Sequence, residues 1–128
     1  MKQDRRAHPR LRERDSVAVK ILASDVTPEL VGRTFFCSTD DLSIEGLRFC
    51  VHTEVPLDAV LELRVAMQEP AAVFTHIGTV VYVKRVENEN PFAIGVHITE
   101  TKEGQLGDWV TTLTRKLAEV RKAAPPAD

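Results

Sequence analysis

The spacing of the apolar residues changes once along this chain, and that change limits the folds open to it. Up to residue 99 the apolar residues recur mostly at every second position, most regularly at 59–67, where Leu61, Leu63, Val65 and Met67 alternate with other residues. Alternation of this kind is typical of a half-buried strand. From residue 106 the spacing becomes three or four and places one stripe on a helix, at Leu106, Trp109, Val110, Leu113, Leu117 and Val120. The pattern predicts a β-rich body followed by one amphipathic helix that Trp109 anchors.

Six segments have the composition and spacing of strands. They are residues 16–23, 33–39, 44–52, 59–67, 73–86 and 92–99. Residues 25–32, 68–70 and 87–91 carry proline, glycine or asparagine and are expected to be loops. Gly78 lies inside the longest segment, where a bulge or bend is expected, and 73–86 should pair antiparallel with 92–99. We expect a small six-stranded antiparallel β-barrel with a C-terminal α-helix, because barrel closure hides strand edges.

The two ends of the chain differ from this body. Residues 1–14 are rich in arginine, have only Ala7 and Leu11 as aliphatic residues, and contain Pro9, so they are expected to form an extended, flexible N-terminal arm. Residues 15–122 are expected to form the barrel domain with its helix, and residues 123–128 a disordered tail. A length of 128 residues fits one domain.

The composition excludes several classes of protein. A hydrophobic content of 43% and a net charge of −2 are typical of a soluble globular protein and argue against a general DNA- or RNA-binding surface. No apolar run is long enough to cross a membrane and no signal-peptide pattern follows Met1, so the cytoplasm is the expected compartment. In that compartment Cys37 and Cys50, which could face each other across a hairpin, are expected to be buried thiols rather than a disulfide.

No arrangement of residues indicates catalysis. The four histidines, His8, His52, His76 and His97, stand at no metal-ligand spacing, and there is no Cys-x-x-Cys. No nucleophile elbow or phosphate-binding glycine loop is present. The neighbouring carboxylates of Asp40, Asp41 and Glu45 are typical of a polar turn. We therefore expect no catalytic residue, no metal and no cofactor, and interpret the protein as a binding module.

Two short motifs supply binding chemistry. The arm carries Arg5, Arg6 and Arg10, and the expected turn at 40–47 carries Asp41, Ser43 and Gly46. An arginine side chain donates two parallel hydrogen bonds to a phosphate or to the O6 and N7 acceptors of guanine. A carboxylate can accept from the other edge of guanine, a serine hydroxyl suits phosphate or sugar, and glycine lets a backbone approach closely. Taken singly, the arginines read as solvated charges and the turn as ordinary hairpin chemistry.

Together, Arg-x-x-x-Arg followed by Asp-x-Ser-x-x-Gly resembles the PilZ domain, the bacterial receptor module for cyclic di-GMP. The resemblance extends over residues 78–82 and 94–98 and the terminal helix. It implies that Arg6 and Arg10 are the two motif arginines, that Asp41 and Ser43 contact guanine and phosphate, and that Gly46 is the close-approach glycine. In the family, an arginine at the position of Arg5 accompanies an intercalated ligand dimer. Departures are Tyr82, where tryptophan is frequent, and Ile98, where an aromatic residue is common.

The leading hypothesis is a cytoplasmic, non-catalytic cyclic di-GMP receptor whose arm folds over the ligand and thereby signals to a downstream protein partner. The alternative is an adaptor of the same fold that binds proteins and no nucleotide. A single-stranded nucleic-acid binder ranks last, because aromatic residues make up only 5% of the chain and the basic cluster is confined to one end. No DNA, RNA or membrane partner is expected.

Overall fold

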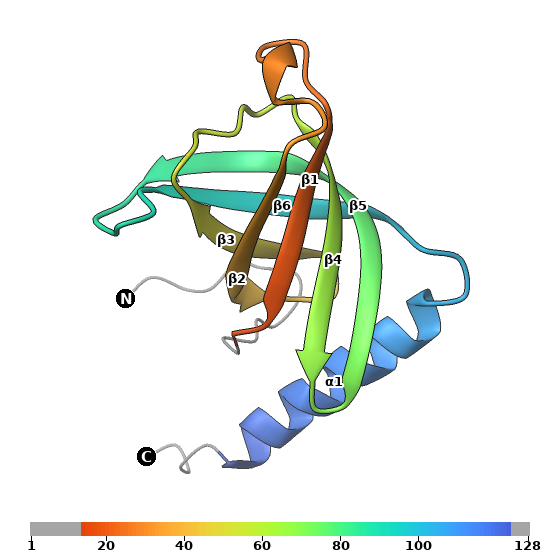
Figure 1. The fold of residues 1–128 in the computed structure, drawn as a ribbon. Helices are drawn as coiled ribbons and strands as arrows, with labels where there is room; N and C mark the ends of the chain where they lie inside the picture. The colour runs from red at the N-terminus through yellow and green to blue at the C-terminus, as the bar shows by residue number, and fades with distance from the viewer. Residues whose placement is uncertain (1–13, 124–128) are drawn as a thin grey trace.

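Residues 14–123 are described by the computed structural model, with side chains described as far as residue 120. The chain forms six strands and then one long helix (Figure 1). The elements are β1 (Ser16–Ala23), a 3-10 turn (Pro28–Leu30), β2 (Thr34–Leu42), β3 (Gly46–Val51), β4 (Val60–Gln68), β5 (Ala71–Arg85), β6 (Phe92–Thr101) and α1 (Leu106–Ala123). Their order and type confirm the predicted fold class.

The strands close into an antiparallel barrel in the order β1-β2-β3-β6-β5-β4. Alternation of side chains fills the interior: on β4, Leu61, Leu63, Val65 and Met67 are buried and the residues between them are not. The long strand β5 pairs with β6 as predicted. Each strand therefore has a neighbour on both sides, and the apolar face of every strand reaches one common core.

The irregularity predicted at Gly78 is present. The β5–β6 register shifts between Ile77 and Gly78. A Cβ built at Gly78 would lie 2.6 Å from Cγ1 of Val96 and 2.7 Å from the carbonyl oxygen of His97. Any side chain at this position would collide with β6, so the glycine is needed where the strand bends.

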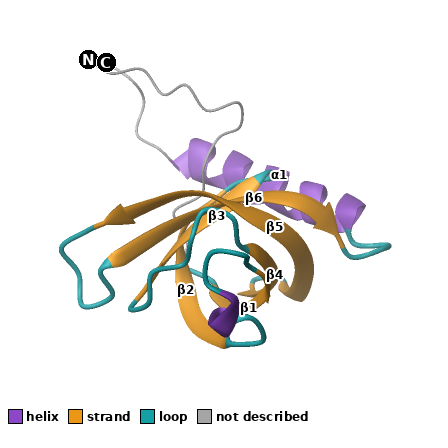
Figure 2. Cartoon of the chain, turned by 90° about the horizontal axis from the view of Figure 1, so that it is seen from above, coloured by secondary structure: helices purple, strands orange, loops and turns teal. Residues whose placement is uncertain are grey.

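Helix α1 lies across one end of the barrel, as Figures 1 and 2 show from two directions. Trp109 is fully buried, with ring centroids 5.2 Å from Phe74 and 4.2 Å from His76, which confirms its predicted role as the anchor. Gln105 fixes the start of the helix to β5, because its side chain accepts from the amide of Thr75 and donates to the carbonyl of Val73.

The rest of the predicted helical stripe is only partly buried. Leu113 is buried, whereas Leu106 and Val120 are 58% and 55% exposed. The helix crosses the end of the barrel, so its first and last turns extend past the strands (Figure 1). Thr112 and Lys116 are buried in the middle instead. Within the described part of the chain, no helix has the length and hydropathy needed to cross a membrane.

Candidate functional site

The structure places one of the two predicted motifs. Asp41, Ser43 and Gly46 lie where β2 turns into β3. Arg5, Arg6 and Arg10 lie outside the described residues. The described part of the candidate site is therefore the hairpin end of the barrel that carries Asp41, Ser43 and Gly46.

The turn is shorter than the sequence predicted. Asp40 and Asp41 were expected in a turn, but β2 continues through Leu42, and only residues 43–45 connect the strands. The reason is a register shift between Thr39 and Asp41 that inserts an extra residue into β2. Asp40 is then half exposed, with Oδ2 3.5 Å from Nε of Arg48, and Asp41 is buried.

The turn is held by hydrogen bonds to its own strands and to β6. The amide of Ser43 donates to the carbonyl of Gly46 at 2.8 Å, and the Ser43 hydroxyl donates to the same oxygen at 3.2 Å. The amide of Ile98 donates to the carbonyl of Glu45 at 2.7 Å. The buried Ser43 hydroxyl thus has a structural role in addition to the phosphate role that the sequence predicts for it.

Gly46 is required by the barrel. It pairs with His97 on β6, and a Cβ built on it would lie 2.5 Å from the carbonyl oxygen of Val96. The backbone of β6 leaves no room for a side chain there. In the structure, the backbone that approaches Gly46 closely is that of β6. Close approach of a ligand stays a prediction.

Helix α1 reaches the same turn. The indole Nε1 of Trp109 donates to the carbonyl of Ile44 at 3.0 Å. Since Ile44 stands between Ser43 and Glu45, the turn is tied to the helix and to β6 at once.

A row of side chains continues from the turn across the outer face of the sheet. Arg48 on β3 pairs with Gly95 on β6, and Gly95 pairs with Tyr82 on β5. The Tyr82 ring covers Gly95, where any Cβ would overlap it, and Nζ of Lys84 lies 5.2 Å from the ring centroid. Arg48 and the half-buried Tyr82 ring therefore lie beside the motif on the outer face of the sheet.

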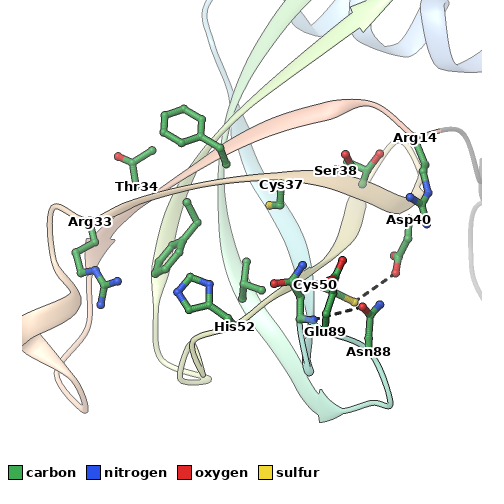
Figure 3. A pocket seen from close by; sticks show the side chains of 15 residues that line it. Arg14, Arg33, Thr34, Cys37, Ser38, Asp40, Cys50, His52, Asn88 and Glu89 are labelled. Atoms are coloured by element: carbon green, nitrogen blue, oxygen red, sulfur yellow. Dashed lines mark hydrogen bonds between the residues drawn. The ribbon is translucent and has the colours of Figure 1, made fainter.

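An open cleft of about 560 Å³ lies on the other side of Asp40. β2 pairs with β3 only near the turn, and the cleft lies where the two strands separate, with residues 88–90 of the β5–β6 loop as its third wall. Figure 3 shows Arg14 and Asp40 at one end and Arg33 with His52 at the other. Arg33 is stacked on Phe35, 5.0 Å from its ring centroid.

Sequence reasoning did not select the residues of this cleft. No spacing distinguishes Arg14 from its neighbours, and Arg33 and His52 have no motif around them. The only available signal was the density of arginines up to residue 14. The cleft itself depends on the separation of two strands, which no local pattern records.

The two cysteines line the cleft as free thiols, which confirms that expectation, although both are half-buried rather than buried. Burial raises the pKa of Cys37 to about 12. Burial and the neighbouring Asp40 carboxylate raise the pKa of Cys50, whose Sγ lies 3.7 Å from Asp40 Oδ2. Neither is a thiolate at neutral pH, so neither is a ready nucleophile. Among the described residues, no three histidine, cysteine or acidic side chains group as a metal site.

Comparisons with known proteins agree with this architecture. A family model described as the PilZ domain matches residues 4–115. No curated protein sequence matches. The chain is similar to the structure of Bacillus subtilis inhibitor of motility (MotI/DgrA), with a TM-score of 0.68 and 11% identity over 91% of this chain and 53% of that one.

Two further similar structures are complexes with cyclic di-GMP. One is the K. pneumonia MrkH–c-di-GMP complex, with a TM-score of 0.64 and 16% identity over 95% of this chain and 57% of that one. The other is the PilZ domain with c-di-GMP of YcgR from Escherichia coli, with a TM-score of 0.52 and 17% identity over 94% of this chain and all of that one. The chain spans about half the length of MotI/DgrA and of MrkH.

Proposed function

The chain belongs to the PilZ domain family, and we propose that it is a cytoplasmic, non-catalytic receptor for cyclic di-GMP. The observation that carries the proposal is the position of Asp41, Ser43 and Gly46 on one hairpin end, beside an open cleft that Arg14 and Asp40 line. MrkH and the YcgR domain are similar in fold, and both structures are complexes with the same ligand.

The proposed role of each side chain follows from its chemistry. Arg6 and Arg10, with Arg5 beside them, donate to phosphate oxygens and to the O6 and N7 acceptors of guanine. Asp41 accepts from the N1 and N2 donors on the other guanine edge, and Ser43 turns its hydroxyl from the Gly46 carbonyl to phosphate, because a hydroxyl has one proton to donate. Gly46 lets β3 pair closely with β6, which shapes the hairpin end that the ligand meets. Arg14 adds a positive charge at the mouth of the cleft.

Signalling follows from the arginines of the N-terminal segment. In this proposal, ligand phosphates draw residues 5–10 onto the hairpin end, and the ordered arm presents a new surface to a downstream protein. The barrel changes little, because its turn is fixed by hydrogen bonds to Ile98 and Trp109.

Isothermal titration calorimetry with cyclic di-GMP, cyclic di-AMP and GTP tests the proposal. We expect cyclic di-GMP to bind with at least about tenfold preference over cyclic di-AMP, because adenine lacks the O6 acceptor and the N1 and N2 donors, and each unpaired group costs on the order of 1–3 kcal/mol. Equal affinity for the two cyclic dinucleotides would refute guanine recognition.

One observation favours the alternative of a protein-binding adaptor without nucleotide. Ser43 and Gly46 have structural roles in this fold, so their presence does not by itself require a ligand. Absence of heat and of chemical-shift change with all three nucleotides would favour the adaptor. The arginine pair distinguishes the two functions, since charged side chains such as those of Arg6 and Arg10 rarely enter an apolar core.

A further inference from the structure

Helix α1 has a face that the barrel does not use. The barrel packs against the side of α1 that carries Trp109, Leu113 and Lys116, all of them buried. A second side has six residues that are exposed or, for Leu117, half-buried: Gly107, Val110, Thr111, Thr114, Leu117 and Ala118. We call these six residues the uncharged face. In Figure 2 the helix lies on the outside of the molecule, with the strands on one side of it only.

The composition of the uncharged face is unusual for a surface helix. Successive members are separated by one or three residues, so they form one continuous stripe. The solvent side of an amphipathic helix normally carries charged residues, and none occurs on this stripe. Four of its members, Gly107, Thr111, Thr114 and Ala118, are small, which lets a second helix approach closely. Val110 and Leu117 supply apolar side chains along one border.

The opposite border is charged. Asp108 lies in the first turn of α1 and Arg115 lies seven residues later, two helical turns along the same border, and both are exposed. Glu119 follows one turn after Arg115, beyond the end of the uncharged face. Beside the uncharged face itself, the two charges are therefore opposite in sign.

We propose that the uncharged face binds the same face of a second copy of this chain, with the two helices antiparallel about a two-fold axis near residues 112 and 113. In that arrangement Gly107 faces Ala118 of the second copy, and Thr111 faces its Thr114. Val110 meets Leu117 along one border, and Asp108 meets Arg115 along the other. Each contact occurs twice, as two-fold symmetry requires.

Charge complementarity selects this partner. The antiparallel arrangement pairs Asp108 with Arg115 twice, whereas a parallel arrangement sets like charges beside each other. Antiparallel helices also align their macrodipoles favourably. Because the uncharged face consists of six residues, four of them small, we expect the dimer to be weak and concentration-dependent. Nucleotide takes no part in it.

Sedimentation equilibrium of the full chain without nucleotide tests the proposal over about 10 µM to 1 mM, where weak complexes dissociate. We expect the mass to rise from one chain toward two. Asp108→Arg and Arg115→Asp should each weaken self-association at least about tenfold, because each creates two like-charge pairs. An equimolar mixture of the two variants should dimerise like the wild type, since the mixed pair restores both attractions.

Glu54→Arg is the matched control. It makes the same change in net charge as Asp108→Arg, but on an exposed residue of the β3–β4 connection rather than of α1, so self-association should be unchanged. Circular dichroism checks that every variant keeps its helix. The proposal is overturned if the wild type stays monomeric throughout, if either single variant dimerises like the wild type, or if the mixture fails to restore the dimer.

Discussion

The indole Nε1 of Trp109 donates a 3.0 Å hydrogen bond to the carbonyl oxygen of Ile44, which joins the buried anchor of α1 to the turn between β2 and β3. These residues are 65 positions apart in the sequence. The bond fixes the middle of the turn whose neighbours carry the Asp-x-Ser-x-x-Gly motif. The helix and the proposed ligand site therefore share one structural element.

Trp109→Phe is expected to destabilise the fold by about 2–4 kcal/mol. Phenylalanine keeps an aromatic ring against Phe74 and His76, but it removes the donor to Ile44 and leaves unfilled volume. Urea unfolding followed by circular dichroism measures the change. Leu106→Ala, on the same helix but 58% exposed, should cost less than about 0.5 kcal/mol. Equal effects of the two substitutions would contradict the role given to Trp109.

Stability should fall with acid because of His76. This side chain is 1% exposed, its Nδ1 lies 2.9 Å from Thr101 Oγ1, and burial lowers its pKa from 6.5 to about 4. The unfolded chain therefore binds a proton at higher pH than the folded chain does. The stability that neutral His76 contributes is complete above pH 6.5 and declines as the pH falls from 6.5 toward about 4.

Urea midpoints at several pH values between 7.5 and 4 measure that decline. His76→Gln should flatten the pH dependence in this range, although it lowers stability at neutral pH. His97→Gln is the control for removal of a histidine from the surface, because His97 is exposed on β6. If the urea midpoints of His76→Gln fall with pH as steeply as those of the wild type, other groups cause the acid sensitivity.

Two glycine-to-alanine substitutions should have opposite signs. Gly46→Ala forces a Cβ to within 2.5 Å of the Val96 carbonyl oxygen, so β3 and β6 must separate, and we expect a cost of about 1–3 kcal/mol. Gly107 lies in α1 with nothing within 4 Å of its Cβ position, and alanine there should stabilise by up to about 1 kcal/mol. Thermal unfolding at low protein concentration compares them. A neutral Gly46→Ala would remove the structural explanation of that residue.

The sequence predicted the strands well because burial alternates along them. On β4, buried residues alternate with exposed or half-buried ones along the whole strand, and the pattern placed that strand within one residue of its observed bounds. The end of β2 was mispredicted for a local reason. Asp40 and Asp41 are common turn formers, and only the register shift after Thr39, set by pairing with β3, keeps them in the strand.

The barrel side of the site was predictable to the extent that it is contiguous in sequence. Asp41, Ser43 and Gly46 fall within six residues, so one hairpin brings them together. The cleft was not predictable, because Arg14, Arg33 and residues 88–90 meet there only through the closure of the barrel. The hydrogen bond between Trp109 and Ile44 depends in the same way on where α1 crosses the barrel.

Arg6→Ala or Arg10→Ala should each remove most cyclic di-GMP binding. Loss of a charge-assisted hydrogen bond typically costs about 1.5–3 kcal/mol, which corresponds to roughly a 10- to 150-fold weaker affinity. Calorimetry measures the affinity, and thermal unfolding should change by less than about 0.5 kcal/mol, since arginine side chains rarely enter an apolar core. Arg12→Ala is the matched control. A large loss of stability in either variant would assign these arginines a structural role.

The proposed closure of the arm makes a further prediction, about order and salt. Fixing a residue costs roughly 1–2 kcal/mol in conformational entropy, and residues 1–14 have few apolar side chains to offset that cost without ligand. Bonds from Arg5, Arg6 and Arg10 to phosphate and guanine can offset it when cyclic di-GMP is bound. Because those bonds are electrostatic, affinity should fall as salt is added. NMR order parameters of residues 5–10 should rise at saturation, while the amides of β4 and β5 barely change. If residues 5–10 are already rigid without nucleotide, or remain mobile when the site is full, closure of the arm is not the signalling step even though the ligand binds.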